Sequence, residues 1–156
     1  MGVEVERKFL VTGESWRADV TSATHIVQGY LAQTGTATVR VRVKGDRAYL
    51  TIKGVSVGIT RSEFEYEIPV ADALAMLDEL AQGPVIDKVR HLVPVGAHTW
   101  EVDVFAGDNA PLVMAEVELA EAEEDFVRPE WAGTDVSDDQ RYFNVNLARS
   151  PYSTWT

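Results

Sequence analysis

Polar and apolar residues alternate along most of the chain, beginning near the N-terminus. In residues 3–11, VEVERKFLV, charges lie at Glu4, Glu6 and Lys8, and Val3, Val5 and Phe9 have the opposite parity. A period of two residues places the two kinds of side chain on opposite faces of a β-strand. The same period recurs further on and predicts eight strands, at residues 3–11, 26–32, 37–44, 47–53, 61–69, 85–93, 99–105 and 112–119.

The longest helical pattern covers residues 71–82, ADALAMLDELAQ, and ends at Gly83-Pro84. Apolar residues recur there every three or four positions, as one face of a helix requires. Two hairpin turns are expected between strands, at Gly45-Asp46 and at Gly96-Ala97-His98. The predicted apolar face of the helix consists of Leu74, Leu77, Leu80 and Ala81.

The C-terminal part predicts a second helix. Ser137 and Gln140 have the spacing of a capping box, and the helix is expected to continue through Leu147. A short helical turn is expected at residues 15–20. Eight antiparallel strands with few helices predict a mainly β (α+β) fold, either a barrel or a sandwich. With 156 residues and no repeat or long linker, the chain is expected to form a single domain, residues 1–156.

Composition restricts the function further. The chain contains no cysteine, which excludes disulfides, thiolate zinc sites and a cysteine nucleophile. The net charge of −11 disfavours binding to nucleic acid or to anionic membranes. No apolar run approaches the roughly 20 residues that span a bilayer, and the N-terminus lacks the pattern of a signal peptide. We therefore expect a cytoplasmic protein without a nucleic-acid or membrane partner.

Basic residues are nevertheless concentrated on the polar strand faces, where carboxylates also gather. Half of the 14 Lys and Arg residues occupy such positions: Lys8, Arg40, Arg42, Lys53, Arg61, Lys88 and Arg90. Alternation alone favours polar faces turned to solvent, the commonest pattern in antiparallel sheets. The alternative is an inverted barrel whose charged faces line a hydrated lumen. Carboxylates suit Mg²⁺ and Arg or Lys suit phosphate, so such a lumen would form a metal-assisted phosphate-ester or phosphoanhydride site.

Taken together, these segments resemble the triphosphate tunnel metalloenzymes, the CYTH superfamily. Glu4-x-Glu6-x-Lys8 is similar to the ExExK signature of that family. Trp131 and the segment RYFN, residues 141–144, resemble its small bacterial members. The remaining similar segments follow the order and spacing of the family: QGYL (28–31), VRVR (39–42), LTIKG (50–54), RSEFEYEI (61–68), DKVRH (87–91), WEVDVF (100–105) and AEVEL (115–119).

The resemblance implies an eight-stranded antiparallel β-barrel tunnel with a polar, charged lumen and a few outer helices. It implies two divalent ions, Mg²⁺ or Mn²⁺, as the cofactor. Lys44, beside a turn, is interpreted as solvated. The implied phosphate cradle consists of Lys8, Arg40, Arg42, Lys53, Arg61, Lys88 and Arg90. The implied metal ligands are Glu4, Glu6, Asp103, Glu116 and Glu118, with Glu63 and Glu65 in supporting positions.

The implied activity is metal-dependent hydrolysis of a triphosphate, foremost inorganic tripolyphosphate. Lys8 and Tyr30 are the catalytic candidates: a pKa of Lys8 lowered by neighbouring arginines would let it take or orient a proton from water beside Tyr30. Tyr30 as a plain core aromatic stays open. Alternatives are a class IV-type adenylate cyclase, a thiamine or nucleoside triphosphatase and, in another class, a non-catalytic module that binds polyphosphate or nucleotide. A homodimer is compatible with the sequence.

Overall fold

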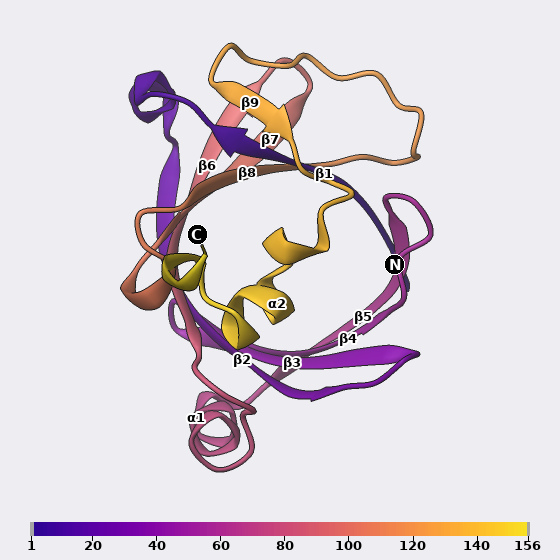
Figure 1. The fold of residues 1–156 in the computed structure, drawn as a ribbon, viewed down its shortest axis with the longest axis vertical. Coiled ribbons are helices and arrows are strands. Elements are labelled where there is room, and N and C mark those ends of the chain that lie inside the picture. Colours follow the sequence, from indigo (N-terminus) through magenta and orange to yellow (C-terminus); the bar gives the residue numbers. More distant parts are fainter. Residues whose placement is uncertain (1, 156) are drawn as a thin grey trace.

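The computed structural model describes residues 2–155 and contains a closed antiparallel β-barrel (Figure 1). Its strands follow the order β5-β4-β3-β2-β6-β7-β8-β1, and pairing of β1 with β5 closes the ring. The predicted barrel and all eight predicted strands are confirmed. The wall consists of β1 (Gly2–Val11), β2 (Ser22–Gln33), β3 (Ala37–Lys44), β4 (Arg47–Gly54), β5 (Thr60–Ile68), β6 (Ile86–Val95), β7 (His98–Phe105) and β8 (Val113–Glu118).

A ninth strand, β9 (Ala132–Asp135), was not predicted. It pairs antiparallel with the second half of β1, after the first half has paired with β5. The strand has only four residues, too few for an alternating pattern to stand out. Gly133 permits the close approach, because a Cβ there would lie 2.9 Å from the carbonyl oxygen of Leu10.

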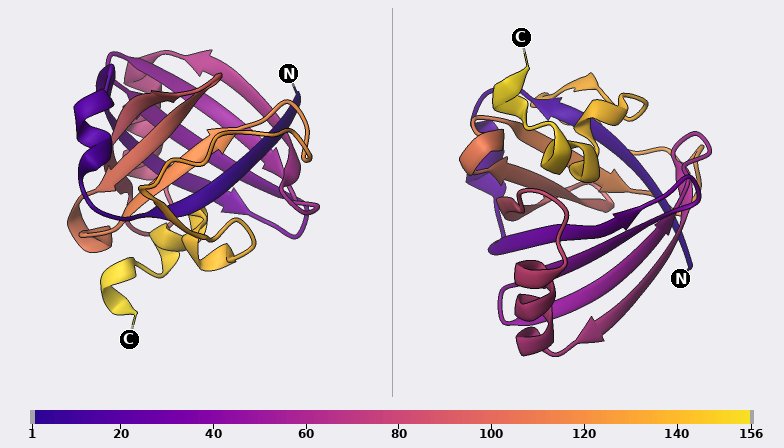
Figure 2. Two further views of the ribbon diagram at one scale, coloured as in Figure 1. Left: turned by 90° about the horizontal axis from the view of Figure 1, so that it is seen from above. Right: turned by 60° about the horizontal axis from the view of Figure 1, so that its bottom comes forward.

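The barrel is inverted: apolar strand faces point outward and charged faces point into the lumen. Over β1, β7 and β8, residues 119–131 and β9 cover the outer face (Figures 1 and 2). Phe9, Trp100 and Trp131 pack there, with the Trp100 ring centroid 5.4 Å from each of the other two. The predicted short helical turn is the 3₁₀ element η1 (Ser15–Asp19), which buries Trp16 against this layer. Solvated polar faces, which alternation alone favoured, are therefore the wrong interpretation.

The first predicted helix is α1 (Val70–Glu79), which packs on the outer face of β2, β3 and β4 (Figure 2). Gly29 allows this packing, because a Cβ there would lie 2.8 Å from the side chain of Leu77. The prediction of residues 71–82 extends three residues too far. The chain leaves the helix because the backbone N–H of Gln82 donates to the carbonyl of Tyr30, 2.8 Å away.

The predicted apolar face of α1 is also partly wrong. Ala73 is fully buried and Leu77 is half-buried against β3 and β4, whereas Leu74 and Leu80 are 56% and 55% exposed. The helix is therefore rotated so that Ala73 lies at the centre of its contact face. The three leucines of the predicted segment, at positions 74, 77 and 80, drew the prediction toward the wrong face, because small residues such as alanine carry little weight in a hydrophobic pattern.

The C-terminal segment lies across one end of the barrel (Figure 1). It contains the 3₁₀ element η3 (Gln140–Tyr142) and α2 (Asn144–Arg149), and we call residues 140–149 the plug. The predicted capping box is wrong, because the Ser137 hydroxyl instead accepts the backbone N–H of Lys8 at 2.8 Å. Apolar residues of the barrel end and the plug pack together: Ile86, Phe105, Met114, Tyr142, Val145 and Leu147.

Two further 3₁₀ elements, η2 (Gly107–Asn109) and η4 (Tyr152–Thr154), lie beside the plugged end, where the backbone N–H of Tyr152 donates to the Asn109 side chain at 2.8 Å. Both predicted hairpin turns are present, at Gly45-Asp46 and after Val95. Within residues 2–155, no helix is long and apolar enough to cross a membrane.

Candidate active site

A cavity with about 190 Å³ of space for water occupies the lumen, between the plug and the open end. Its wall includes eight of the 14 Lys and Arg residues of the chain and seven of its carboxylates. The basic residues are Lys8, Arg40, Arg42, Lys44, Lys53, Arg61, Lys88 and Arg90, and the acidic ones are Glu4, Glu6, Glu63, Glu65, Glu101, Glu116 and Glu118. Tyr30 also lines the cavity, whereas Asp103 does not.

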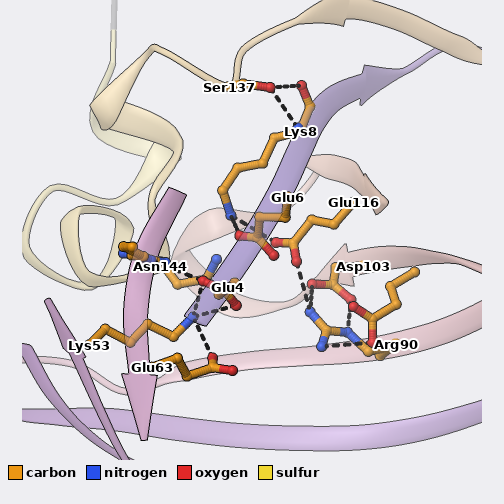
Figure 3. Close-up of polar contacts among 12 residues, drawn as sticks. Glu4, Glu6, Lys8, Lys53, Glu63, Arg90, Asp103, Glu116, Ser137 and Asn144 are labelled. Atoms are coloured by element: carbon orange, nitrogen blue, oxygen red, sulfur yellow. Dashed lines mark hydrogen bonds and ion pairs between the residues drawn. The ribbon is translucent and has the colours of Figure 1, made fainter. Parts of the chain in front are cut away.

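Glu4 is held by two basic residues at the seam of the barrel. It lies directly opposite Arg61 in the β1–β5 pairing, and the Arg61 Nε donates to its carboxylate at 2.9 Å. Lys53 reaches the same carboxylate from β4 at 3.0 Å and also contacts Glu63 at 3.3 Å (Figure 3). Burial acts to raise the pKa of Glu4, but Lys53 and Arg61 outweigh it and lower the pKa to about 2. Glu4 is therefore ionised and fixes the positions of both cations.

Lys8 points at two carboxylates, as Figure 3 shows. Its ammonium lies 2.9 Å from Glu116, its partner across the β1–β8 ladder, and 3.1 Å from Glu6. Burial alone would lower the pKa of Lys8, but the charges of Glu116 and Glu6 raise it above the ordinary value. The expected lowering of this pKa is therefore wrong. Lys8 stays protonated and serves as a hydrogen-bond donor.

Asp103 lies behind the cavity wall and is 1% exposed. It accepts two hydrogen bonds of 2.8 Å from Arg90, and the Lys88 ammonium lies 2.8 Å away. Burial would raise the pKa of Asp103, but Arg90 and Lys88 lower it to about 2. Both oxygens of Asp103 are occupied by contacts to Arg90 and Lys88. This carboxylate therefore holds the two basic side chains in place at the wall of the lumen.

Arg40 is positioned through β4. Its Nη2 donates to the Thr51 hydroxyl at 3.1 Å, and that hydroxyl donates to Glu65 at 2.9 Å. Glu65 lies 3.5 Å from the Arg40 guanidinium as well. The carboxylate of Glu65 therefore helps to hold Arg40 in place.

The pKa values of Glu6 and Glu118 are raised, whereas those of Glu4, Asp103 and Glu116 are lowered. Glu6 and Glu118 lie directly opposite each other in the β1–β8 ladder. Burial and the charge of Glu116 raise the pKa of Glu6 to about 7, and burial and Glu4 raise that of Glu118. Glu118 forms no ion pair with any residue between 2 and 155. Negative charge is thus undercompensated at this point, as a cation site requires.

The donor set at Glu6 and Glu118 fits a hard cation that binds few protein ligands. Within the described part of the chain, no three acidic or histidine side chains converge as a complete ligand set. Mg²⁺ normally binds one or two carboxylates and completes its shell with water and substrate phosphates. Two facing carboxylates beside a phosphate-sized basic cavity provide that arrangement.

The fold is shared with known proteins. The family model described as "CYTH domain" matches residues 2–150. This chain belongs to the CYTH family. It is 44% identical to an inorganic triphosphatase of Acetivibrio thermocellus, over 99% of both chains. An inorganic triphosphatase of Nitrosomonas europaea is 36% identical, over 94% of this chain and 97% of that one.

Solved structures support the same CYTH assignment. The inorganic triphosphatase NE1496 matches with a TM-score of 0.64 and 34% identity, over 94% of this chain and 95% of that one. The PH1012 protein of Pyrococcus horikoshii OT3 matches with a TM-score of 0.62 at 20% identity and shows the shared fold. The match covers 77% of this chain and 81% of that one. Triphosphatases of the CYTH family are metal-dependent. The family expected from the sequence is confirmed.

Sequence reasoning missed several residues at the CYTH cavity, among them Glu101, which lines it and lies 3.2 Å from Arg90. Gln28 shares the inward face of β2 with Tyr30 and donates to the Tyr30 hydroxyl at 2.9 Å, so strand parity was the available signal. Lys44 also has inward parity and lines the cavity, although it was interpreted as solvated. Asn144 reaches the cavity from the plug. No sequence pattern indicated this, because the path of the plug depends on tertiary packing.

Proposed function

We propose that this chain hydrolyses inorganic tripolyphosphate to pyrophosphate and phosphate inside the barrel, with a divalent cation. The observation that carries the proposal is the ionic cavity itself. Among the described residues, 15 of the 20 that line it are charged, in a chain 44% identical to an inorganic triphosphatase over 99% of its length. Of residues 2–155, two aromatic ones line it, Tyr30 and Phe143, so the wall offers little to a nucleobase or a thiazole ring. A chain of bare phosphates suits such a wall.

The basic residues bind and orient the phosphates. Guanidinium groups form paired hydrogen bonds with phosphate oxygens, and ammonium groups act as point charges. Glu4, Asp103 and Glu65 already hold their cations in place, so few side chains must be reordered when the anion binds. Phosphoryl transfer depends chiefly on such positioning and on charges that are fixed in advance.

Glu6 and Glu118 are the proposed centre of the metal site, with Glu4 and Glu116 beside them. We propose Mg²⁺ or Mn²⁺, in two ions. When bound, the cation supplies neutralisation of charge on the phosphoryl group and orientation of the reacting water. Lys8 holds the Glu6 carboxylate by its 3.1 Å contact. Tyr30 accepts a hydrogen bond from Gln28, which leaves its own O–H free to donate to a phosphate oxygen or to water.

A phosphate-release assay tests the substrate. Tripolyphosphate, ATP and thiamine triphosphate are compared at equal concentration, each with Mg²⁺, Mn²⁺ or EDTA. We expect release from tripolyphosphate with Mg²⁺ or Mn²⁺, little release from the two organic triphosphates, and none in EDTA. Faster turnover of ATP or thiamine triphosphate than of tripolyphosphate would assign a different substrate, and release in EDTA would remove the metal from the mechanism.

A second experiment separates an enzyme from a receptor for polyphosphate. Glu6→Gln and Glu118→Gln each remove one negative charge from the cavity wall. An enzyme that needs these carboxylates loses turnover, whereas its binding of tripolyphosphate in EDTA is unchanged or tighter. Glu67→Gln is the matched control, because Glu67 forms an exposed pair with Arg47 outside the cavity. Wild-type turnover in both cavity variants contradicts the proposed metal site.

A further inference from the structure

Two neutral amide side chains lie among the charged groups at the plugged end of the cavity. Gln28 is fully buried on β2, opposite Arg42 of β3. Its Oε1 accepts the Arg42 Nε at 2.7 Å, and its Nε2 donates to the Tyr30 hydroxyl at 2.9 Å. The same Nε2 donates to the Oδ1 of Asn144 at 3.3 Å. One amide therefore contacts two cavity groups and the plug.

Asn144 completes the connection from the side of the plug. Its Oδ1 accepts the Lys88 ammonium at 2.8 Å as well as the Gln28 amide. Lys88 is fully buried, and its ammonium also contacts Asp103 at 2.8 Å. An ammonium has three N–H donors. Asp103 and Asn144 take two of them, and the third is left to point into the cavity that Lys88 lines.

The choice of an amide at these positions has a physical reason. A carboxylate at residue 28 or 144 would accept from Arg42 or Lys88 but would offset the charge that attracts phosphate, and an apolar residue would accept nothing. An amide oxygen orients a cation while leaving its full charge, and the amide N–H₂ links the two side chains. Gln28 and Asn144 together therefore orient Arg42, Lys88 and Tyr30 without reducing the positive potential.

We propose that Gln28 and Asn144 are positioning residues for phosphate binding, and that Asn144 makes docking of the plug a condition for a fully assembled phosphate site. The inference rests on the proposed function. The plug is then more than a cover of the barrel end, because its first helical residue sets the direction of the Lys88 ammonium. Substrate affinity in turn stabilises the docked plug, since binding and docking favour each other by the same free energy.

The test is isothermal titration of tripolyphosphate into Asn144→Ala in EDTA, so that no metal is needed for the readout. Asn146→Ala is the matched control: the same change in the same helix removes a hydrogen bond from Asn146 Nδ2 to the Gln140 carbonyl, outside the cavity. Asn144→Leu is the second variant, because it keeps a branched side chain at the barrel end, so that no cavity is left, and removes the polar amide. Thermal unfolding of each variant records the state of the fold.

We expect both Asn144 variants to bind tripolyphosphate about tenfold more weakly than Asn146→Ala, as loss of a hydrogen bond to a charged group implies. In the metal-loaded assay, KM rises by a similar factor and kcat falls less. Equal affinity of Asn144→Leu and Asn146→Ala overturns the inference. So does a loss of affinity that tracks only the loss of thermal stability in all three variants. If the wild-type chain neither binds nor hydrolyses tripolyphosphate, the proposed function fails instead.

Discussion

Replacing Asp103 with Asn tests whether this carboxylate is an internal counterion. The substitution leaves Arg90 and Lys88 buried, with their shared negative partner gone. Removing one member of a buried ion pair typically costs about 3–5 kcal/mol. The lowered pKa gives an independent value: with 3.8 as the ordinary value and about 2 in the fold, ionised Asp103 contributes about 2–3 kcal/mol. That stability is fully present above pH 3.8 and is lost as the pH falls toward 2.

Both values are compatible with a loss of about 3 kcal/mol in the free energy of unfolding of Asp103→Asn. A loss of about this size lowers the melting temperature by roughly 10 °C in a domain of this size. We expect the loss to be larger at pH 6 than at pH 9. Burial lowers the pKa of Lys88 to about 7 in the intact protein. Lys88 is therefore charged at pH 6, where it needs Asp103 as a counterion, whereas at pH 9 it is a neutral amine that needs none. Urea unfolding at both pH values, in EDTA, measures this difference.

Glu67→Gln is the control for Asp103→Asn, because its pair with Arg47 is exposed and contributes at most about 1 kcal/mol. If Asp103→Asn unfolds at the same urea concentration as this control, Asp103 does not act as a counterion. If it loses affinity for a divalent cation at unchanged stability, Asp103 is a metal ligand and its assignment to Arg90 and Lys88 is refuted.

Three further predictions concern charge and packing. Glu6 has a pKa raised to about 7, so its ionisation destabilises the metal-free fold as the pH rises from 4.5 to 7; urea unfolding in EDTA should find Glu6→Gln more stable than wild type at pH 8 and similar at pH 4. Gly29→Ala should displace α1 and lower the melting temperature, because its Cβ would lie 2.8 Å from Leu77; Gly35→Ala, in open space, is the control measured by the same melt. Finally, stopped-flow binding of tripolyphosphate should be slower at 10 mM than at 100 mM salt, since the net charge of −11 repels the anion over a longer range when screening is weak.

The sequence predicted the barrel wall well, because each strand carries a period of two that a local reading detects. The misses in β9, at the end of α1 and at Ser137 have a tertiary cause. The strand β9 exists because Gly133 lets it approach β1, and the end of α1 is set by a hydrogen bond from Gln82 to Tyr30. The capping box at Ser137 failed for the same reason, since Lys8 uses the hydroxyl that would have capped a helix. Local sequence patterns do not show which distant backbone group will form a hydrogen bond with a given side chain.

The charged residues of the site were predictable, but their partners were not. Strand parity placed Glu4 and Lys53 on the polar faces, and the resemblance to the CYTH family implied that these faces point inward. The 3.0 Å contact between Glu4 and Lys53, however, depends on the closure of β1 against β5. The pKa of Lys8 was expected to fall beside arginines; it rises because Glu116 faces it in the β1–β8 register. The register between distant strands therefore determines the pKa and the partners of each charged group. That register cannot be predicted from a single sequence by its local patterns.

The distribution of charge explains why so acidic a chain fits a polyanion. The cavity wall holds eight basic and seven acidic residues, whereas the rest of the chain holds six basic and 18 acidic ones. Cations confined in one lumen repel each other, and interleaved carboxylates offset that repulsion and the cost of burial. Glu4, Glu65 and Glu116 are occupied in this way. Glu118 pairs with no basic residue between 2 and 155, and Glu6 shares Lys8 with Glu116, so both carry more negative charge than the nearby cations offset. Such an excess is difficult to explain in a simple anion receptor, whereas a metal-dependent hydrolase requires it.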